Sequence, residues 1–151
     1  MSMMEIKYTK NIVKLSNQIH RMFFAHSGDN GAQECILHFI LENYPQREIC
    51  QKDVQHELGT RPSTVASTLK RLEQQGLIVR ERVCGDERKK RIFPTKAALE
   101  KKAKIQQELE TVELGLLLGI SQKELSTFEI VVEKMIRNCQ SALENCDKEG
   151  L

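Results

Sequence analysis

The chain has 151 residues, enough for one ordinary domain or a compact module with helical extensions, and too few for two comfortable domains. Its 40% apolar and 29% charged content is typical of a folded helical protein and argues against disorder. No stretch approaches the roughly 18 consecutive apolar residues of a membrane span, and Met1 to Lys10 lacks the apolar core of a secretory signal, so we expect a cytoplasmic protein.

The charge is unevenly distributed along the chain. The net charge is only +2, but the segment from Arg61 to Arg91 holds nine Lys/Arg against four Asp/Glu, a local charge of +5 that leaves −3 for the rest. A basic segment in an otherwise slightly acidic chain indicates a local surface for a polyanion. A merely solvated charged face is the alternative on charge alone.

The N-terminal half predicts short helices separated by turns. Apolar residues at steps of three and four predict a helix over 8–25, ended by Ser27 to Gly31, and a second helix that stops near Tyr44 because Pro45 disfavours helical geometry before it. A third helix covers 51–58 and ends at Gly59, whose freedom at positive φ suits a C-terminal cap. These elements predict a mainly α fold.

A fourth helix and a basic hairpin follow. Pro62 suits the first turn of a helix whose inward stripe is Val65, Leu69 and Leu72, and Gly76 ends it. Residues 77–79 and 91–93 predict two strands around a Gly-Asp turn within 83–87. The register of the second strand stays open at this point.

The C-terminal third predicts two long helices. Thr95 is placed to cap the first, with an apolar seam of Leu99, Ile105, Leu109, Val112 and Leu116, and Gly119 interrupts it. Ser121 and Glu124 form an S-x-x-E capping box that starts the second, whose stripe is Phe128, Val132, Met135, Cys139 and Leu143. Such seams exceed what the small central unit can cover, so we expect the outer helices to pair with a second copy.

Helix, tight turn, helix and basic hairpin is the element order of a winged helix-turn-helix. The face opposite the Val65 stripe carries hydroxyls and an arginine that suit the major groove of DNA. We therefore expect the DNA-binding residues to be Arg61, Ser63, Thr64, Ser67, Thr68, Lys70, Arg71, Arg88, Lys89 and Lys90. Asp86 is expected to orient Arg88 through an ion pair instead of contacting DNA. Hydroxyls near a helix start can also serve only as caps, which is the structural alternative.

Residues 58–78, with Asp86-Glu87-Arg88 before Pro94-Thr95, resemble the MarR family of bacterial transcription regulators. The resemblance implies a homodimer in which residues 33–95 form the winged lobe and residues 1–27 and 96–151 form dimerisation helices, all within one module spanning 1–151. It also implies a pseudo-palindromic DNA site and a small-molecule effector that relieves repression. The effector would bind in a pocket between the first helix, the second helix and the long helix after the hairpin, and we assign no residues to that pocket. Two departures weaken the helix caps, because Cys50 and Arg61 stand where the pattern has Ser or Thr.

Other chemistries have less support. Cys84 lies among arginines in the predicted wing, so a redox-sensing regulator is one alternative, and a winged-helix module for protein contacts is another. The five cysteines are odd in number and show no CxxC pair, so we expect no disulfide framework, and Cys35, Cys50 and Cys139 fall on or beside apolar stripes. The four histidines show no helical metal spacing, so we expect no metal, and we expect no cofactor. The sequence contains no catalytic motif, and we do not expect an enzyme.

Overall fold

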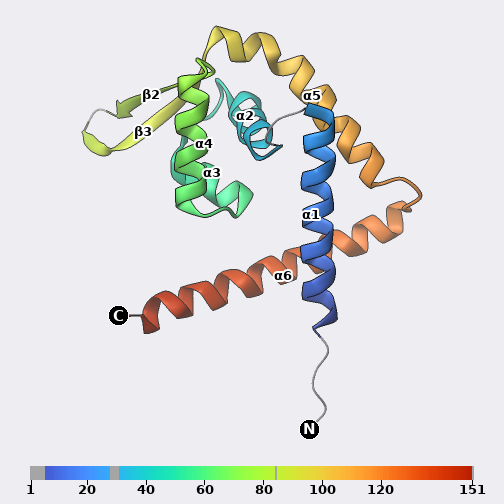
Figure 1. Cartoon of the computed structure of the whole chain (residues 1–151). Helices are drawn as coiled ribbons and strands as arrows, with labels where there is room; N and C mark the ends of the chain where they lie inside the picture. The colour runs from blue at the N-terminus through green and yellow to red at the C-terminus, as the bar shows by residue number, and fades with distance from the viewer. Residues whose placement is uncertain (1–5, 28–30, 84, 151) are drawn as a thin grey trace. The chain divides into compact units, whose positions relative to one another are not determined.

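The computed structural model describes residues 6–27, 31–83 and 85–150, with the backbone but not the side chains of 24, 26–27, 31–32 and 86–88. The chain divides into two compact units, Met1–Leu116 and Leu117–Leu151. The first unit carries five helices and a small sheet in the described residues, and the second carries one long helix (Figure 1). A mainly helical fold with a small β-hairpin, as predicted, is confirmed.

The helices before the hairpin match their predicted positions closely. They are α1 (Lys7–Ser27), α2 (Gly31–Asn43), α3 (Gln51–Leu58) and α4 (Pro62–Gln74). Gly59 has a φ of 59° at the end of α3, and Pro62 occupies the first turn of α4. Both residue types suit those backbone positions, because glycine tolerates positive φ and proline needs no N–H partner at a helix start. The turn expected between α1 and α2 includes residues 28–30, which lie outside the described part.

The hairpin is longer than the sequence predicted. Strand β2 covers Ile78–Val83, and β3 covers Asp86–Pro94 instead of residues 91–93 alone. The register pairs Ile78 with Pro94 and Arg80 with Ile92, with an irregularity between Arg82 and Val83. The basic residues joined the strand because ladder hydrogen bonds use only the backbone, and exposed charged side chains do not oppose them.

A third strand was not predicted. Strand β1 (Ile49–Cys50) pairs antiparallel with β3, giving the order β1-β3-β2. Two residues are too few to show an alternating pattern, so the sequence carried no signal for β1. The pairing ties the segment before α3 to the root of the hairpin.

One hydrophobic core holds these elements together. Its members come from α2, α3, α4, the sheet and the following helix, and the most enclosed are Ile36, Ile40, Leu41, Val54, Val65, Leu69, Leu72 and Ile78. Burying an aliphatic side chain of this size contributes roughly 1.5–3 kcal/mol. The predicted inward stripe of α4 is therefore confirmed, and it fixes which face of that helix is left for solvent.

Helix α5 (Lys96–Leu116) begins where Thr95 joins two elements. The Thr95 hydroxyl accepts a hydrogen bond from the Ala98 N–H at 3.3 Å and donates one to the Gly76 carbonyl at 2.7 Å. The predicted cap is confirmed, but the predicted seam is partly wrong. Ala98, Ile105 and Val112 are buried while Leu99 is exposed, because a neighbouring residue on a helix is rotated by about 100° from the core side.

The second unit contains α6 (Gln122–Glu149). The predicted capping box is confirmed, since the Glu124 N–H donates to the Ser121 hydroxyl at 3.2 Å and the Ser121 N–H donates to the Glu124 carboxylate at 2.8 Å. These backbone and side-chain hydrogen bonds from Ser121 lower the pKa of Glu124. No residue of α6 is buried within the single described chain, and Phe128 and Leu143 of its stripe are largely exposed. Among the described helices, none is long and apolar enough to cross a membrane.

Candidate nucleic-acid interface

Helix α4 presents a polar face to solvent. Its apolar stripe is held in the core, and the opposite side exposes Ser63, Thr64, Ser67, Lys70 and Arg71. Arg61 precedes the helix as its N-cap residue, is exposed, and makes no side-chain cap hydrogen bond. Small hydroxyls along one line and cations around them match what a helix in a major groove needs, which is close approach to base edges and contact with phosphates.

The expectation that Thr68 projects outward is wrong. Thr68 is only 5% exposed, and its hydroxyl donates to the Thr64 carbonyl at 2.9 Å. A threonine can satisfy its hydroxyl against the preceding helical turn, so it can lie next to Leu69 and Leu72 without an unsatisfied polar group. Position 68 lies three residues after Val65, which places it on the inward side.

Ser67 keeps its place on the exposed face. Its hydroxyl also donates to the Thr64 carbonyl, at 3.0 Å, but the side chain is exposed and its oxygen can still accept a hydrogen bond. The start of α4 is linked to α3 by the Gln51 amide, which donates to the Pro62 carbonyl at 3.4 Å. One hydrogen bond therefore links α3 to the first turn of the helix that carries the exposed hydroxyl face.

The hairpin carries the second group of predicted residues. Lys89 and Lys90 are exposed on β3, which projects from the C-terminal end of α4 together with β2 (Figure 1). Asp86 and Arg88 lie at the start of β3, but their side chains are outside the described residues, as is Cys84 altogether. The orienting ion pair between Asp86 and Arg88 and the redox role of Cys84 stay predictions.

Two ion pairs join the hairpin to the rest of the lobe, and neither was predicted from the sequence. Arg80 of β2 pairs with Glu73 of α4 at 2.5 Å, and Arg91 of β3 pairs with Glu48 beside β1 at 2.7 Å. Two of the nine basic residues between Arg61 and Arg91 are thus matched by carboxylates of this chain. Glu73 and Arg80 are seven residues apart across a turn, a spacing that carries no helical or strand signal.

Asp53 is hydrogen-bonded to Cys50, the N-cap residue of α3. Its carboxylate accepts hydrogen bonds from the Cys50 N–H at 2.8 Å and the Cys50 thiol at 3.1 Å, and pairs with Arg47 at 3.1 Å. Partial burial raises the pKa of Asp53, but the two Cys50 hydrogen bonds and the charges of Arg47 and Lys89 outweigh it, so the net pKa is lowered. The acid at the third helical position thus supplies one half of a capping box, because it accepts from the backbone N–H of the N-cap residue Cys50.

Among the side chains that the structure describes, the remaining cysteines and histidines form no recognisable site. Burial and the nearby Glu34 charge raise the pKa of the Cys35 thiol, which suits a small apolar residue, whereas Cys139 is exposed instead of packed. His38 bonds Gln106 of α5 and lies 3.9 Å from Glu42. Within the described residues, no three His, Cys, Asp or Glu side chains converge as metal ligands.

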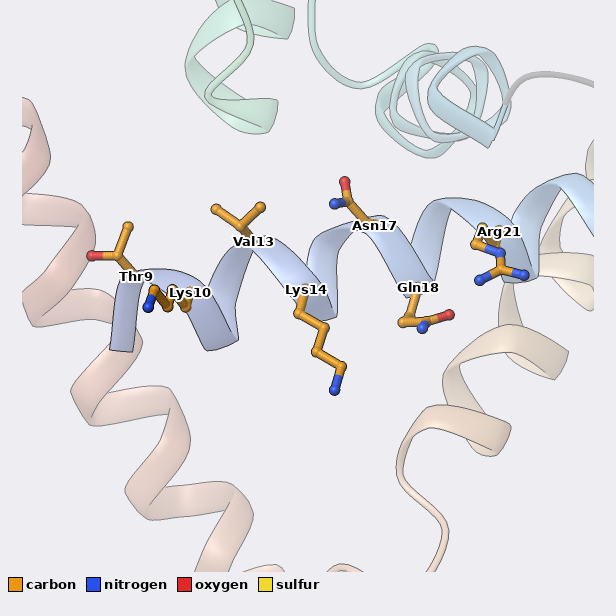
Figure 2. A pocket seen from close by; sticks show the side chains of 7 residues that line it. All are labelled: Thr9, Lys10, Val13, Lys14, Asn17, Gln18 and Arg21. Carbon is orange, nitrogen blue, oxygen red and sulfur yellow. The ribbon is translucent and has the colours of Figure 1, made fainter. Parts of the chain in front are cut away.

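A surface hollow of about 440 Å³ lies along α1. All of its lining residues come from that helix, and Figure 2 shows Thr9, Val13 and Asn17 pointing to one side while Lys14 and Gln18 point to the other. A site walled by a single helix encloses no ligand, since binding pockets bury most of a ligand's surface. This hollow does not correspond to the effector pocket expected between the first, second and long helices.

Comparisons with known proteins agree with the fold. A model of the MarR family matches residues 30–89. The S. aureus MepR–DNA complex is similar with a TM-score of 0.76 at 20% identity, over 89% of this chain and 99% of that one. A MarR family transcriptional regulator from Listeria monocytogenes, complexed with 26mer DNA, gives 0.75 at 22% identity over 90% and 89%. The transcriptional regulator SlyA gives 0.73 at 24% identity over 92% and 96%.

The family model covers α2 to β3, which are the elements that carry the hydroxyl face of α4 and the basic hairpin. The structural similarity extends over nearly the whole chain. Residues 30–89 therefore match the MarR family, and the chain as a whole shares the fold of these solved regulators.

Proposed function

We propose that this chain is a homodimeric transcription regulator that binds double-stranded DNA by sequence. The observation that carries the proposal is the exposed face of α4, where hydroxyls and cations lie beside a basic hairpin on one rigid core. Helix α4 would enter the major groove and the hairpin would reach the adjacent backbone or minor groove. Two related structures contain DNA, the MepR complex and the Listeria protein, which supports this choice of partner.

The proposed contacts fall into two groups. Ser63, Thr64 and Ser67 face the base edges. The cations Arg61, Lys70, Arg71, Arg88 and Lys90 grip phosphates or guanine. Phosphate contacts set affinity and its salt dependence, whereas base contacts set sequence preference. Thr68 is left out because its hydroxyl is buried and bonded within α4. Lys89 is left out because it shares a strand face with Arg91, which is paired with Glu48.

The dimer is proposed from the outer helices, with residues 33–95 as the DNA-binding lobe and residues 1–27 and 96–151 as dimerisation helices. Large apolar side chains are exposed on α1, including Ile12 at 51%, and on α6, including Phe128 at 55% and Leu143 at 65%. Contiguous apolar faces of this kind mark association surfaces. A two-fold dimer would place two copies of α4 in successive major grooves, about 34–36 Å apart, on an inverted repeat.

Regulation by a small molecule is proposed by analogy. The heme sensor protein PefR from Streptococcus agalactiae, in complex with heme, has a TM-score of 0.56 at 22% identity over 89% of this chain and 95% of that one. An effector that favours a dimer with the wrong lobe spacing would weaken DNA binding and relieve repression. We propose no catalytic activity, and a regulator of this kind would act where the chromosome lies, in the cytoplasm.

The test is selection of tight binders from a randomised duplex pool, followed by fluorescence anisotropy at two salt concentrations. We expect an enriched inverted repeat bound by two chains. Ser67→Ala should change preference at one or two base pairs, whereas Arg71→Ala should weaken binding to all duplexes and reduce the salt dependence. A folded protein that binds no duplex at either salt concentration would refute the proposal and favour a protein-contact module.

A further inference from the structure

The basic side chains of the hairpin are divided between its two faces. Successive residues of a strand point to opposite sides, so Lys90 and Ile92 share one face of β3 while Lys89 and Arg91 share the other. Ile92 is in the core and lies opposite Arg80. Lys90 therefore lies on the hairpin face that packs against the core at the root of the hairpin, and this is the face toward α4.

The face with Arg91 is tied to the protein itself. Arg91 lies opposite Cys50 of β1 and forms its ion pair with Glu48 at 2.7 Å. Lys89, two residues earlier on this side, makes no ion pair within 4.0 Å among the described side chains, but its charge contributes to the lowered pKa of Asp53 in α3. This face therefore holds one cation paired with a carboxylate of the same lobe, Arg91, and a second cation, Lys89, that points to the same side.

On the face toward α4, the cation near the root of the hairpin is paired with a carboxylate, whereas those further out are not. Near the root, Arg80 is occupied by Glu73 of the helix. Further out, Arg82 lies directly opposite Lys90 in the ladder, and both side chains are exposed. Among the side chains that the structure describes, no carboxylate comes within 4.0 Å of either one.

Two like charges opposite each other on one face destabilise a strand pair. Such an arrangement has a cost in the free protein, and an anion between the two cations removes it. A DNA phosphate is such an anion, and the pair lies on the recognition-helix side of the hairpin, where the proposed function places the DNA backbone.

We infer that Arg82 and Lys90 form a cross-strand phosphate clamp, and that Lys89 and Arg91 hold the hairpin in place without contacting DNA. This inference rests on the proposed function and refines it. Arg82 is a binding residue that the sequence pattern did not single out, and Lys89 passes from the DNA-contacting group to the positioning group. One face of the hairpin then contacts the rest of the lobe, and the other face contacts the nucleic acid.

The experiment measures the salt dependence of DNA binding for wild type, Arg82→Gln, Lys90→Gln and the matched control Lys89→Gln. Each lost phosphate contact should reduce the slope of log K against log salt by about 0.9 per bound protomer. We expect that reduction for Arg82→Gln and for Lys90→Gln, and a wild-type slope for Lys89→Gln. All three remove one positive charge from neighbouring positions, so general charge loss would affect them equally.

A second measurement separates binding from folding. Because the two cations repel each other in the free protein, Arg82→Gln should keep or raise the thermal unfolding midpoint while it weakens DNA binding. A wild-type slope for Arg82→Gln, or an equal loss of slope for Lys89→Gln, would overturn the clamp. Absence of duplex binding by the wild type would instead overturn the proposed function, and the clamp with it.

Discussion

The ion pair between Glu73 and Arg80 offers a test of how the hairpin is positioned. It joins the last turn of α4 to β2 at 2.5 Å, with side chains 44% and 22% exposed. Ion pairs at protein surfaces contribute about 0.2–1 kcal/mol, and this one should lie near the upper end because Arg80 is mostly enclosed. A double-mutant cycle with Glu73→Gln and Arg80→Gln should therefore give a coupling energy of about 1 kcal/mol in urea unfolding.

The direction of the change in DNA affinity in Glu73→Gln distinguishes a positioning role from a simple charge effect. If only net charge mattered, removing an acidic group near DNA would strengthen binding. If the pair holds the hairpin at the correct angle to α4, losing about 1 kcal/mol of positioning weakens binding roughly fivefold. Fluorescence anisotropy at constant salt measures this directly. Equal or tighter binding by Glu73→Gln, with a coupling energy below about 0.3 kcal/mol, would refute the positioning argument.

Three further predictions follow from buried or paired groups. Thr68→Val should leave DNA affinity unchanged and cost less than about 1 kcal/mol in urea unfolding, because only an internal hydrogen bond is lost; a large loss of affinity would put Thr68 back among the contacts. Asp53 has a folded pKa lowered below its ordinary 3.8, so its stabilisation is present above that value and is lost as the pH falls through the folded pKa. The stability difference between wild type and Asp53→Asn should thus shrink from pH 7 to pH 2.5, and an unchanged difference would contradict this. Met135→Glu places a charge in the α6 stripe and should convert the dimer to monomers in sedimentation; an unchanged mass would remove α6 from the proposed interface.

Local patterns were sufficient for the order of elements. Apolar residues at steps of three and four located the helices before the hairpin. Gly59 located the end of α3, Pro62 the start of α4, and the Ser121–Glu124 box the start of α6. These signals work because helical hydrogen bonds, caps and backbone preferences involve residues within one turn of each other. The hydroxyl-rich exposed face of α4 followed from the same periodicity.

Contacts between distant segments required the tertiary structure. Strand β1 exists because β3 lies beside it, and the pairing of Arg82 with Lys90 depends on a ladder register that neither strand encodes alone. Thr68 lies three residues after Val65 and so on the inward side of α4, and it is buried because neighbouring elements pack over that side.

The charged residues also divide into what the sequence determines and what the tertiary structure determines. Composition placed nine cations in one segment, but only the folded lobe brings Glu48 and Glu73 to two of them and leaves Arg82 facing Lys90. The energy of an ion pair depends on separation in space and on solvent exposure, not on separation in sequence. The sequence by itself therefore determined that this protein carries a basic helix-and-hairpin surface, and the tertiary structure decided which of the described cations are paired with carboxylates of the same lobe.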